Sequence, residues 1–263
     1  MAGSRIALGL ALLAAAAAWG ARGAAHAAVL HAYVGGTSGN VVSRIDLATN
    51  EATPIPVGDS PMGVAASADG GRVVVTNHIS GSASIIDGST GGVLATVPVG
   101  SFPIGVGVLP DGSKAYVANS GDGSISVLDV AGGALLDTLP IDGFPFGVAV
   151  SPSGHRAYVT SSFNFGTMLV IDTATDTIVA DVLVSTVSEP RGVVASPDGT
   201  RVYVGLTSAV AVVDATTNLL LDADCVFDRQ LDGAAALLGH EVAEPCGLLA
   251  LVGLDAGFPA LCN

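Results

Sequence analysis

The chain is poor in positive charge, in charged residues of any kind and in aromatic residues. Only 9 of its 263 residues are Lys or Arg, against 23 Asp or Glu, so the formal net charge at pH 7 is −14. A surface with this balance repels phosphate backbones and anionic lipids, which argues against nucleic acid as a partner. Charged residues make up 12% of the chain and hydrophobic residues 50%, with 35 Gly. This composition favours many short strands joined by tight turns over surface helices, which need Lys and Glu.

Cysteine is also scarce, and its placement is uneven. Cys225, Cys246 and Cys262 all lie near the C-terminus. In an oxidising compartment, one pair can form a disulfide and leave one thiol over. The sequence leaves open which pair this is.

Long hydrophobic runs are confined to the first residues. Arg5 precedes an apolar run over residues 6–19, and the small residues of "AHA" at 25–27 follow it. This order is typical of a cleavable secretory signal peptide, with an uncleaved anchor as the alternative. Beyond residue 27 no apolar stretch is long enough to cross a bilayer, so we expect no transmembrane segment after signal removal. The sequence therefore predicts a secreted or periplasmic protein, cleaved near Ala27, with a single domain over residues 28–263.

One pattern of about 42 residues recurs along that domain. The units "SPMGVAASADGGRVVVTN", "FPIGVGVLPDGSKAYVAN", "FPFGVAVSPSGHRAYVTS" and "EPRGVVASPDGTRVYVGL" begin at Ser60, Phe102, Phe144 and Glu189. Each holds two β-branched apolar runs around an Asp-Gly or similar turn, which indicates a hairpin. Two further strand-like runs follow, such as Ser124–Asp129 and Ala134–Ile141. Four strands per unit, repeated, predict the blades of an all-β propeller, because solenoid coils are shorter and sandwiches do not repeat a motif so faithfully.

The repeated segments resemble the YVTN-type β-propeller repeats. The residues that carry the resemblance are "VVVTN" (Val73–Asn77), "AYVAN" (Ala115–Asn119) and "AYVTS" (Ala157–Ser161), with the aspartate-ended strands and Pro-x-Gly-Val hairpins around them. The resemblance runs from about Val29 to Leu221 and implies a propeller of four-stranded antiparallel blades. It also implies a binding or surface protein, since such propellers are largely non-catalytic. A minority of similar propellers are lactonases, lyases, or quinone- or haem-bearing domains of redox enzymes.

The number of blades and the closure of the ring depend on the two ends of the domain. "HAYVGG", from His31, matches a second strand, so the first blade (residues 31–58) lacks its innermost strand. An unpaired strand edge would leave free N–H and C=O groups, so another segment should fill this place.

The C-terminus offers that segment. "VAEPCGLLAL" at 242–251 aligns with "VSEPRGVVAS" at 187–196, after an insertion at about 226–241. We therefore expect about five blades, closed by a strand at about 245–251. The alternative is an incomplete ring, or a chain that closes only by homo-association.

Candidate ligand-binding residues lie where propellers bind ligands, at the mouth of the channel. They are Arg191, Glu189, Glu244, His78, Asn119 and Asp122. Arg191 stands out, because the other units place Met62, Ile104 and Phe146 between the same Pro and Gly. A lone cation there can clamp a carboxylate ligand, or it can pair with Glu189 or Glu244. His78 is either a general base or an ordinary exposed turn residue.

Nothing in the sequence predicts catalytic residues, a metal or a cofactor. The acids near the mouth fall in adjacent units and not around the ring, whereas Ca²⁺ needs six to eight oxygen ligands. There is no G-x-S-x-G, H-E-x-x-H, C-x-x-C or phosphate-binding loop. The aspartates that end the third strands recur once per unit, which indicates a turn-forming role.

The sequence thus predicts an exported, non-catalytic propeller that acts as a binding or scaffold module for an unidentified protein or small molecule. One alternative is a propeller enzyme or enzyme subunit, similar to lactonases, lyases or quinoproteins, with its site at the channel mouth. A further alternative is a structural component of a surface layer or matrix.

Overall fold

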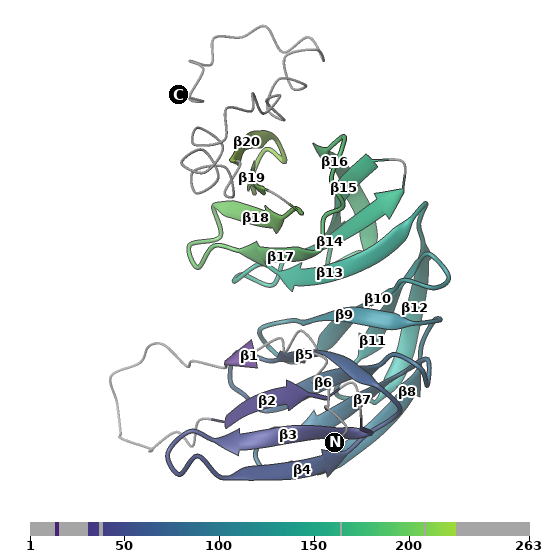
Figure 1. Cartoon of the computed structure of the whole chain (residues 1–263), viewed down its shortest axis with the longest axis vertical. Coiled ribbons are helices and arrows are strands. Elements are labelled where there is room, and N and C mark those ends of the chain that lie inside the picture. The colour runs from purple at the N-terminus through teal and green to yellow at the C-terminus, as the bar shows by residue number, and fades with distance from the viewer. Residues whose placement is uncertain (1–13, 16–30, 37–38, 164, 208, 225–263) are drawn as a thin grey trace, which may run out of the picture.

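The described part of the chain is made of β-strands alone. The computed structural model describes residues 14–15, 31–36, 39–163, 165–207 and 209–224. These residues form five four-stranded antiparallel sheets and no helix, so they also contain no helix long and apolar enough to span a membrane. The five sheets follow one another along a curved array, from the β2–β4 end to the β17–β20 end (Figure 1). This arrangement confirms the all-β class and the division into four-stranded units.

Each sheet is a simple meander whose strands follow chain order. The first three sheets contain β1 (Ala14–Ala15), β2 (His31–Gly35), β3 (Val41–Asp46) and β4 (Ala52–Pro56); β5 (Pro61–Ala66), β6 (Arg72–Asn77), β7 (Ser82–Asp87) and β8 (Val93–Pro98); and β9 (Pro103–Val108), β10 (Lys114–Asn119), β11 (Ser124–Asp129) and β12 (Ala134–Pro140). The last two contain β13 (Phe144–Val150), β14 (Arg156–Phe163), β15 (Phe165–Asp172) and β16 (Thr177–Ser185); and β17 (Gly192–Ala195), β18 (Arg201–Gly205), β19 (Val210–Asp214) and β20 (Leu220–Asp224).

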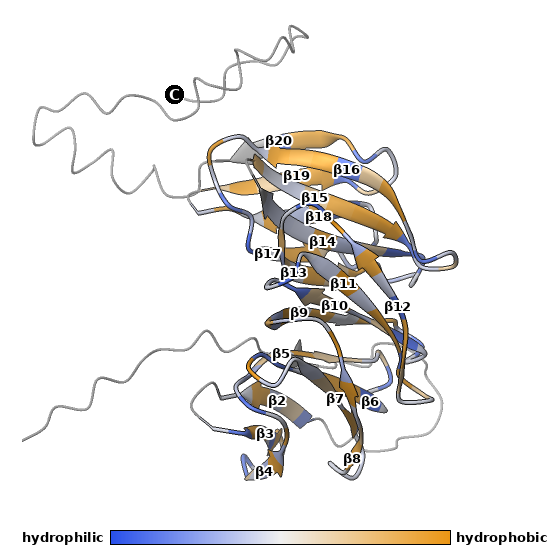
Figure 2. Ribbon diagram, turned by 90° about the vertical axis from the view of Figure 1, so that its right-hand side faces the viewer, coloured by the Kyte–Doolittle hydropathy of each residue, from blue (hydrophilic) through white to orange (hydrophobic). Residues whose placement is uncertain are grey.

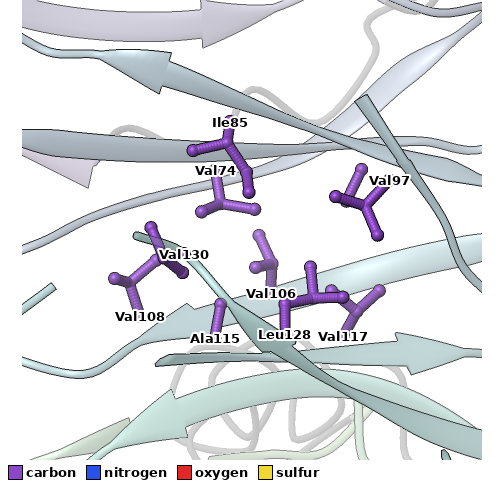
Figure 3. Close-up of a cluster of buried hydrophobic side chains, with 10 residues drawn as sticks. Val74, Ile85, Val97, Val106, Val108, Ala115, Val117, Leu128 and Val130 are labelled. Atoms are coloured by element: carbon purple, nitrogen blue, oxygen red, sulfur yellow. The ribbon is translucent and has the colours of Figure 1, made fainter. Parts of the chain in front are cut away.

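Successive sheets pack face to face through small apolar cores. In β10, Ala115 and Val117 point toward the preceding sheet, whereas Tyr116 and Ala118 point toward the next one. Alternate residues of a strand lie on opposite faces, so a strand buried on both sides needs apolar residues, or polar residues that are hydrogen-bonded, at every position. Figure 3 shows one such core, with Val74 and Ile85 facing Val106, Val117 and Leu128 across two sheets. The second and third strands accordingly combine apolar residues with buried, hydrogen-bonded polar ones, such as Ser84 and Ser126. Figure 2 shows orange, hydrophobic stretches along β16, β19 and β20.

The first strands of neighbouring sheets lie unusually close to one another. β5 contacts β9, β9 contacts β13, and β13 contacts β17, which brings the inner edges of the sheets together. At Gly63, Gly105 and Gly147 an added Cβ would overlap a carbonyl oxygen of the next first strand, that of Ile104, Phe146 and Arg191 respectively. The glycine of each Pro-x-Gly motif is therefore required by strand-to-strand contact. Among the described residues no comparable contact joins the last sheet to the first.

The aspartates that end the third strands shape the turns that follow them. Asp87 Oδ1 accepts hydrogen bonds from the backbone N–H groups of Ser89 (3.0 Å) and Thr90 (2.9 Å) and from the Ser89 hydroxyl. The Ser89 hydroxyl and the turn N–H groups lower the pKa of Asp87 from 3.8 to about 2. Asp46, Asp129, Asp172 and Asp214 likewise accept backbone N–H groups two or three residues ahead. This is the turn-forming role that their recurrence predicts.

The first sheet is completed differently from the sequence prediction. Ala14 and Ala15, from the predicted signal peptide, form β1 and pair with Tyr33 and Ala32 of β2. The prediction gave this place to residues 245–251, which lie outside the described residues, as do the insertion at 226–241, Glu244 and the three cysteines. The reason for the pairing is general: the edge of β2 offers unpaired backbone groups, and an extended apolar segment can satisfy them.

The close approach of the first strands can be tested at Gly105. We expect Gly105→Ala to destabilise the protein by about 1–3 kcal/mol, because the methyl group overlaps the Phe146 carbonyl oxygen and forces the backbones apart. The measurement is urea unfolding followed by circular dichroism. Gly36→Ala is the matched control, since no residue that the structure describes lies within 4 Å of its Cβ position. Equal stability of the two variants would contradict the packing account.

The Asp87 turn makes a prediction about pH. A carboxyl whose pKa is lower in the folded state stabilises the fold above its unfolded pKa of 3.8, and this contribution fades as the pH falls toward about 2. Asn can form the same turn without the charge. The difference in unfolding free energy between wild type and Asp87→Asn should therefore be largest above pH 4 and shrink toward pH 2. A difference that stays constant over this range would refute the assignment.

Candidate functional site

The connecting loops meet on one face of the array, here called the loop face. It is formed by the loops between second and third strands and by the loops that enter each first strand. The two kinds of loop are tied together by backbone hydrogen bonds, such as His78 N–H to Ser60 O (3.0 Å) and Gly121 N–H to Ser101 O (2.9 Å). Loops held on a rigid scaffold are the usual place for recognition.

A pocket of about 270 Å³ opens on the loop face beside the fourth sheet, and we call it the aromatic groove. Its lining consists of Phe144, Ser162, Phe165, Gly166, Thr186, Val187, Ser188 and Glu189. Phe144 and Phe165 are each 54% exposed and Val187 is 72% exposed. Exposed apolar side chains gathered beside hydroxyl groups and a carboxylate are characteristic of binding surfaces.

The aromatic groove exists because the second hairpin of this sheet is longer than its counterparts. β14 and β15 have eight residues each, whereas β10 and β11 have six. The extra length carries Phe165 beyond the level of the neighbouring hairpins, opposite Phe163 in the strand register. Phe144 in turn pairs with Ser162 at the start of β13.

The loop over residues 186–189 forms the other wall of the aromatic groove. The Ser185 hydroxyl accepts hydrogen bonds from Val187 N–H (3.2 Å) and Ser188 N–H (2.8 Å). A Cβ on Gly166 would lie 2.6 Å from Ser188 O, so the loop rests directly on β15. Both walls are therefore held by backbone contacts, and the groove is preformed.

Arg191 lies beside the aromatic groove and is engaged on two sides. Its Nη2 is 3.0 Å from Glu189 Oε2, and its guanidinium carbon lies 4.8 Å from the centre of the Phe146 ring. Of the two alternatives left by the sequence, the structure contains the ion pair with Glu189. Both side chains are about 60% exposed, so water screens the pair and a ligand can compete for either partner.

The other candidates lie on the loop face but away from the groove. The His78 ring packs against the Phe102 ring at 5.1 Å, and its Nδ1 is 3.3 Å from Pro103 O. No described contact links His78 to an acid that could orient it as a general base. Glu244 lies outside the described residues.

Asn119 and Asp122 have structural partners. Asn119 is fully buried, and its Nδ2 donates to the hydroxyls of Ser124 (3.0 Å) and Ser126 (2.9 Å). Asp122 accepts hydrogen bonds from Ser101 N–H (2.7 Å) and from the Ser124 hydroxyl (2.6 Å). Asn77 bonds to Ser82 and Ser84 in the same way, so these contacts are part of the repeat. Their side chains hold loops together and do not reach the aromatic groove.

The structure thus brings Glu189 and Arg191 together and separates them from His78, Asn119 and Asp122. Phe144 and Phe165 were not identified from the sequence as candidate binding residues. The sequence contains a sign of them, because "FNF" at 163–165 stands where the preceding unit has the Ser, Gly and Asp residues of "SGDG" at 120–123. In the part of the chain that the structure describes, no three His, Cys, Asp or Glu side chains are grouped as metal ligands would be.

The described polar groups of the groove are few. The carboxylate of Glu189 is paired with Arg191, and the other polar side chains are the hydroxyls of Ser162, Thr186 and Ser188. These groups can donate hydrogen bonds to a ligand or accept them from it.

Comparisons with known proteins give evidence about the fold of this chain and little about its function. No family model matches the chain. No curated protein matches it either. Among solved structures the chain is similar to hydrazine synthase of Kuenenia stuttgartiensis, with a TM-score of 0.65 and 25% sequence identity over 74% of this chain and 64% of that one. The chain therefore spans less than two thirds of that neighbour. The sheets, their packing and this likeness define an all-β, β-propeller-like protein.

Proposed function

We propose that the chain is an exported, non-catalytic binding module whose ligand lies in the aromatic groove. The observation that carries this proposal is the exposure of Phe144 and Phe165 on a preformed, loop-built surface. Large apolar side chains exposed together on a rigid surface mark an interaction site, because burying them against a ligand is favourable. The predicted signal peptide and the net charge of −14 suit a protein that works outside the cytoplasm.

The composition of the groove favours an uncharged, ring-containing ligand such as a saccharide. A sugar ring offers an apolar face to a phenyl ring and hydroxyl groups around its edge. Phe144 and Phe165 supply the apolar contacts, and Ser162, Ser188 and Glu189 supply acceptors for the hydroxyl groups. A charged ligand would have to compete with the ion pair that already joins Glu189 to Arg191.

A second candidate function follows from the structural comparison. The similar chain carries the name of an enzyme, hydrazine synthase, and the likeness covers 74% of this chain. The chain would then be a propeller-like subunit or domain of an enzyme. The two candidates differ in what a ligand undergoes: it is bound unchanged in the first and converted in the second.

We further propose that the five sheets form a closed propeller, of the type that the YVTN-like repeats imply. Gly192 supports this proposal. It is the glycine of the fourth Pro-x-Gly motif, yet no described residue lies within 4 Å of its Cβ position, whereas Gly63, Gly105 and Gly147 each face a described carbonyl oxygen in the following Pro-x-Gly motif. In each of these three contacts the carbonyl belongs to the residue between Pro and Gly of the following motif. The next such motif is "PCG" at 245–247. Removal of the predicted signal peptide also removes β1 from the edge of β2, so in the shortened chain Cys246 is the residue expected to face Gly192.

Closure can be tested at Gly192 in the chain that lacks residues 1–27. If a further first strand lies against it, Gly192→Ala should destabilise the protein by about 1–3 kcal/mol, as Gly105→Ala does. If the site is open, alanine should be neutral or stabilising by up to about 1 kcal/mol, because it restricts the unfolded chain. Urea unfolding distinguishes the two results. A monomeric mass by light scattering shows whether the strand comes from the same chain.

Binding can be tested by thermal shift with a panel of disaccharides: cellobiose, maltose and chitobiose. We expect at least one to raise the melting temperature of the wild type and to lose this effect in Phe144→Ala and Phe165→Ala, because each variant removes a stacking surface. Phe102→Ala is the matched control, since Phe102 is equally exposed on the loop face but lies outside the groove. The proposal fails if no disaccharide acts, or if the groove variants respond like the wild type. Conversion of a bound compound would favour the enzyme candidate.

A further inference from the structure

Arg44 occupies a position that is apolar in every other sheet. It lies on β3, paired with Tyr33 of β2. The residues at the same register of the other sheets are Ile85, Val127, Val170 and Val212. The cation thus replaces a residue whose repeated role is to pack between sheets. Burying part of an arginine at such a place is costly unless the charge is compensated.

Among the described residues, Arg44 has no carboxylate within 4.0 Å, and the Asp46 charge acts on it only at longer range. Nη2 donates to Ser89 O (2.8 Å) and lies 3.4 Å from His31 Nδ1, while Nε is buried with no hydrogen-bond partner among the described residues. Desolvation and the Arg44 charge lower the pKa of His31, so the imidazole is no counter-ion. By contrast, Arg72, Lys114, Arg156 and Arg191 each have a carboxylate within 4.0 Å.

A cavity of about 260 Å³ opens at this arginine, between β4 and the turn that leads into β8. Arg44, Thr53 and Thr90 contribute its polar side chains, and Ile55 and Val93 are among its apolar ones. Gly91 keeps the space free, because a Cβ there would lie 3.1 Å from Arg44 Nη1. The Gly91 φ of +77° also disfavours any other residue. The cavity therefore combines one guanidinium that has no described carboxylate within 4.0 Å, two hydroxyl groups and an apolar wall.

We infer that this cavity binds a small organic carboxylate, with the carboxylate on the Arg44 guanidinium and a short apolar tail against Ile55 and Val93. A guanidinium offers parallel N–H donors that match a carboxylate, and Nη1 makes no hydrogen bond to any described residue. The hydroxyl of Thr53 can donate to the second carboxylate oxygen. This site lies on the first and second sheets, away from the aromatic groove of the fourth, and does not depend on the function proposed there.

A purely structural role for Arg44 is the competing explanation. The Arg44–Ser89 hydrogen bond ties the first sheet to the turn of the second, as Tyr33 OH does by donating to Gly88 O (2.9 Å). That role involves Nη2 alone and gives no hydrogen-bond partner to Nε or Nη1. It predicts a loss of stability when Arg44 is replaced, but no ligand.

The test uses the full chain and butyrate as the probe, measured by isothermal titration at constant ionic strength. We expect saturable binding to the wild type that falls by about tenfold or more in Arg44→Ile, which inserts the residue of the second sheet. Arg201→Ala, which removes an exposed arginine of the fifth sheet, is the control and should bind butyrate like the wild type. If Arg44→Ile does not fold, Arg44→Gln keeps the polarity and length of the side chain and should show the same loss.

Three outcomes would overturn the inference. The first is no saturable binding of butyrate to the wild type. The second is equal affinity in the wild type and in the Arg44 variant that folds. The third is equal binding of acetate, sulfate and butyrate, since that result would mean that the guanidinium attracts any anion and that the apolar wall plays no part.

Discussion

The contact between the first strands of neighbouring sheets is the constraint on which the rest of the molecule depends. At Gly63, Gly105 and Gly147 the backbones approach so closely that no side chain fits between them. This contact fixes the spacing of the sheets along their inner edge, and the apolar cores between the sheets then fill the space behind it. It also gathers the loops that enter the first strands onto one face, where the aromatic groove forms.

Much of this architecture could be predicted from the sequence, because the repeat makes each unit a check on the others. The hairpins, the strand at Ser124–Asp129 and the turn-forming aspartates were predicted correctly. The recurring glycine of the Pro-x-Gly motif was recognised, but its physical cause lies in a contact between units, which no single unit reveals. The pairing of Ala14 and Ala15 with β2 was missed, since a predicted leader carries no blade pattern.

The candidate sites were harder to predict, because they arise where one unit departs from the repeat. Asn119 and Asp122 drew attention as polar loop residues, yet the Asn119 Nδ2 group bonds to Ser124 and Ser126, and the Asp122 carboxylate bonds to Ser101 and Ser124 within the fold. The aromatic groove depends on the lengthened β14–β15 hairpin. Arg44 can be recognised as a cation at an otherwise apolar position only when the register of the third strands is known. In a repeat protein, the departures from the pattern are better guides to binding than the pattern itself.

The central claim is that the five sheets close into one compact propeller whose loop face carries the groove. Small-angle X-ray scattering of residues 28–263 tests this claim most directly. A closed monomer of this length should have a radius of gyration of about 18 Å and the mass of a single chain. A value above about 22 Å, larger than compact domains of this length show, would contradict closure, and so would a doubled mass.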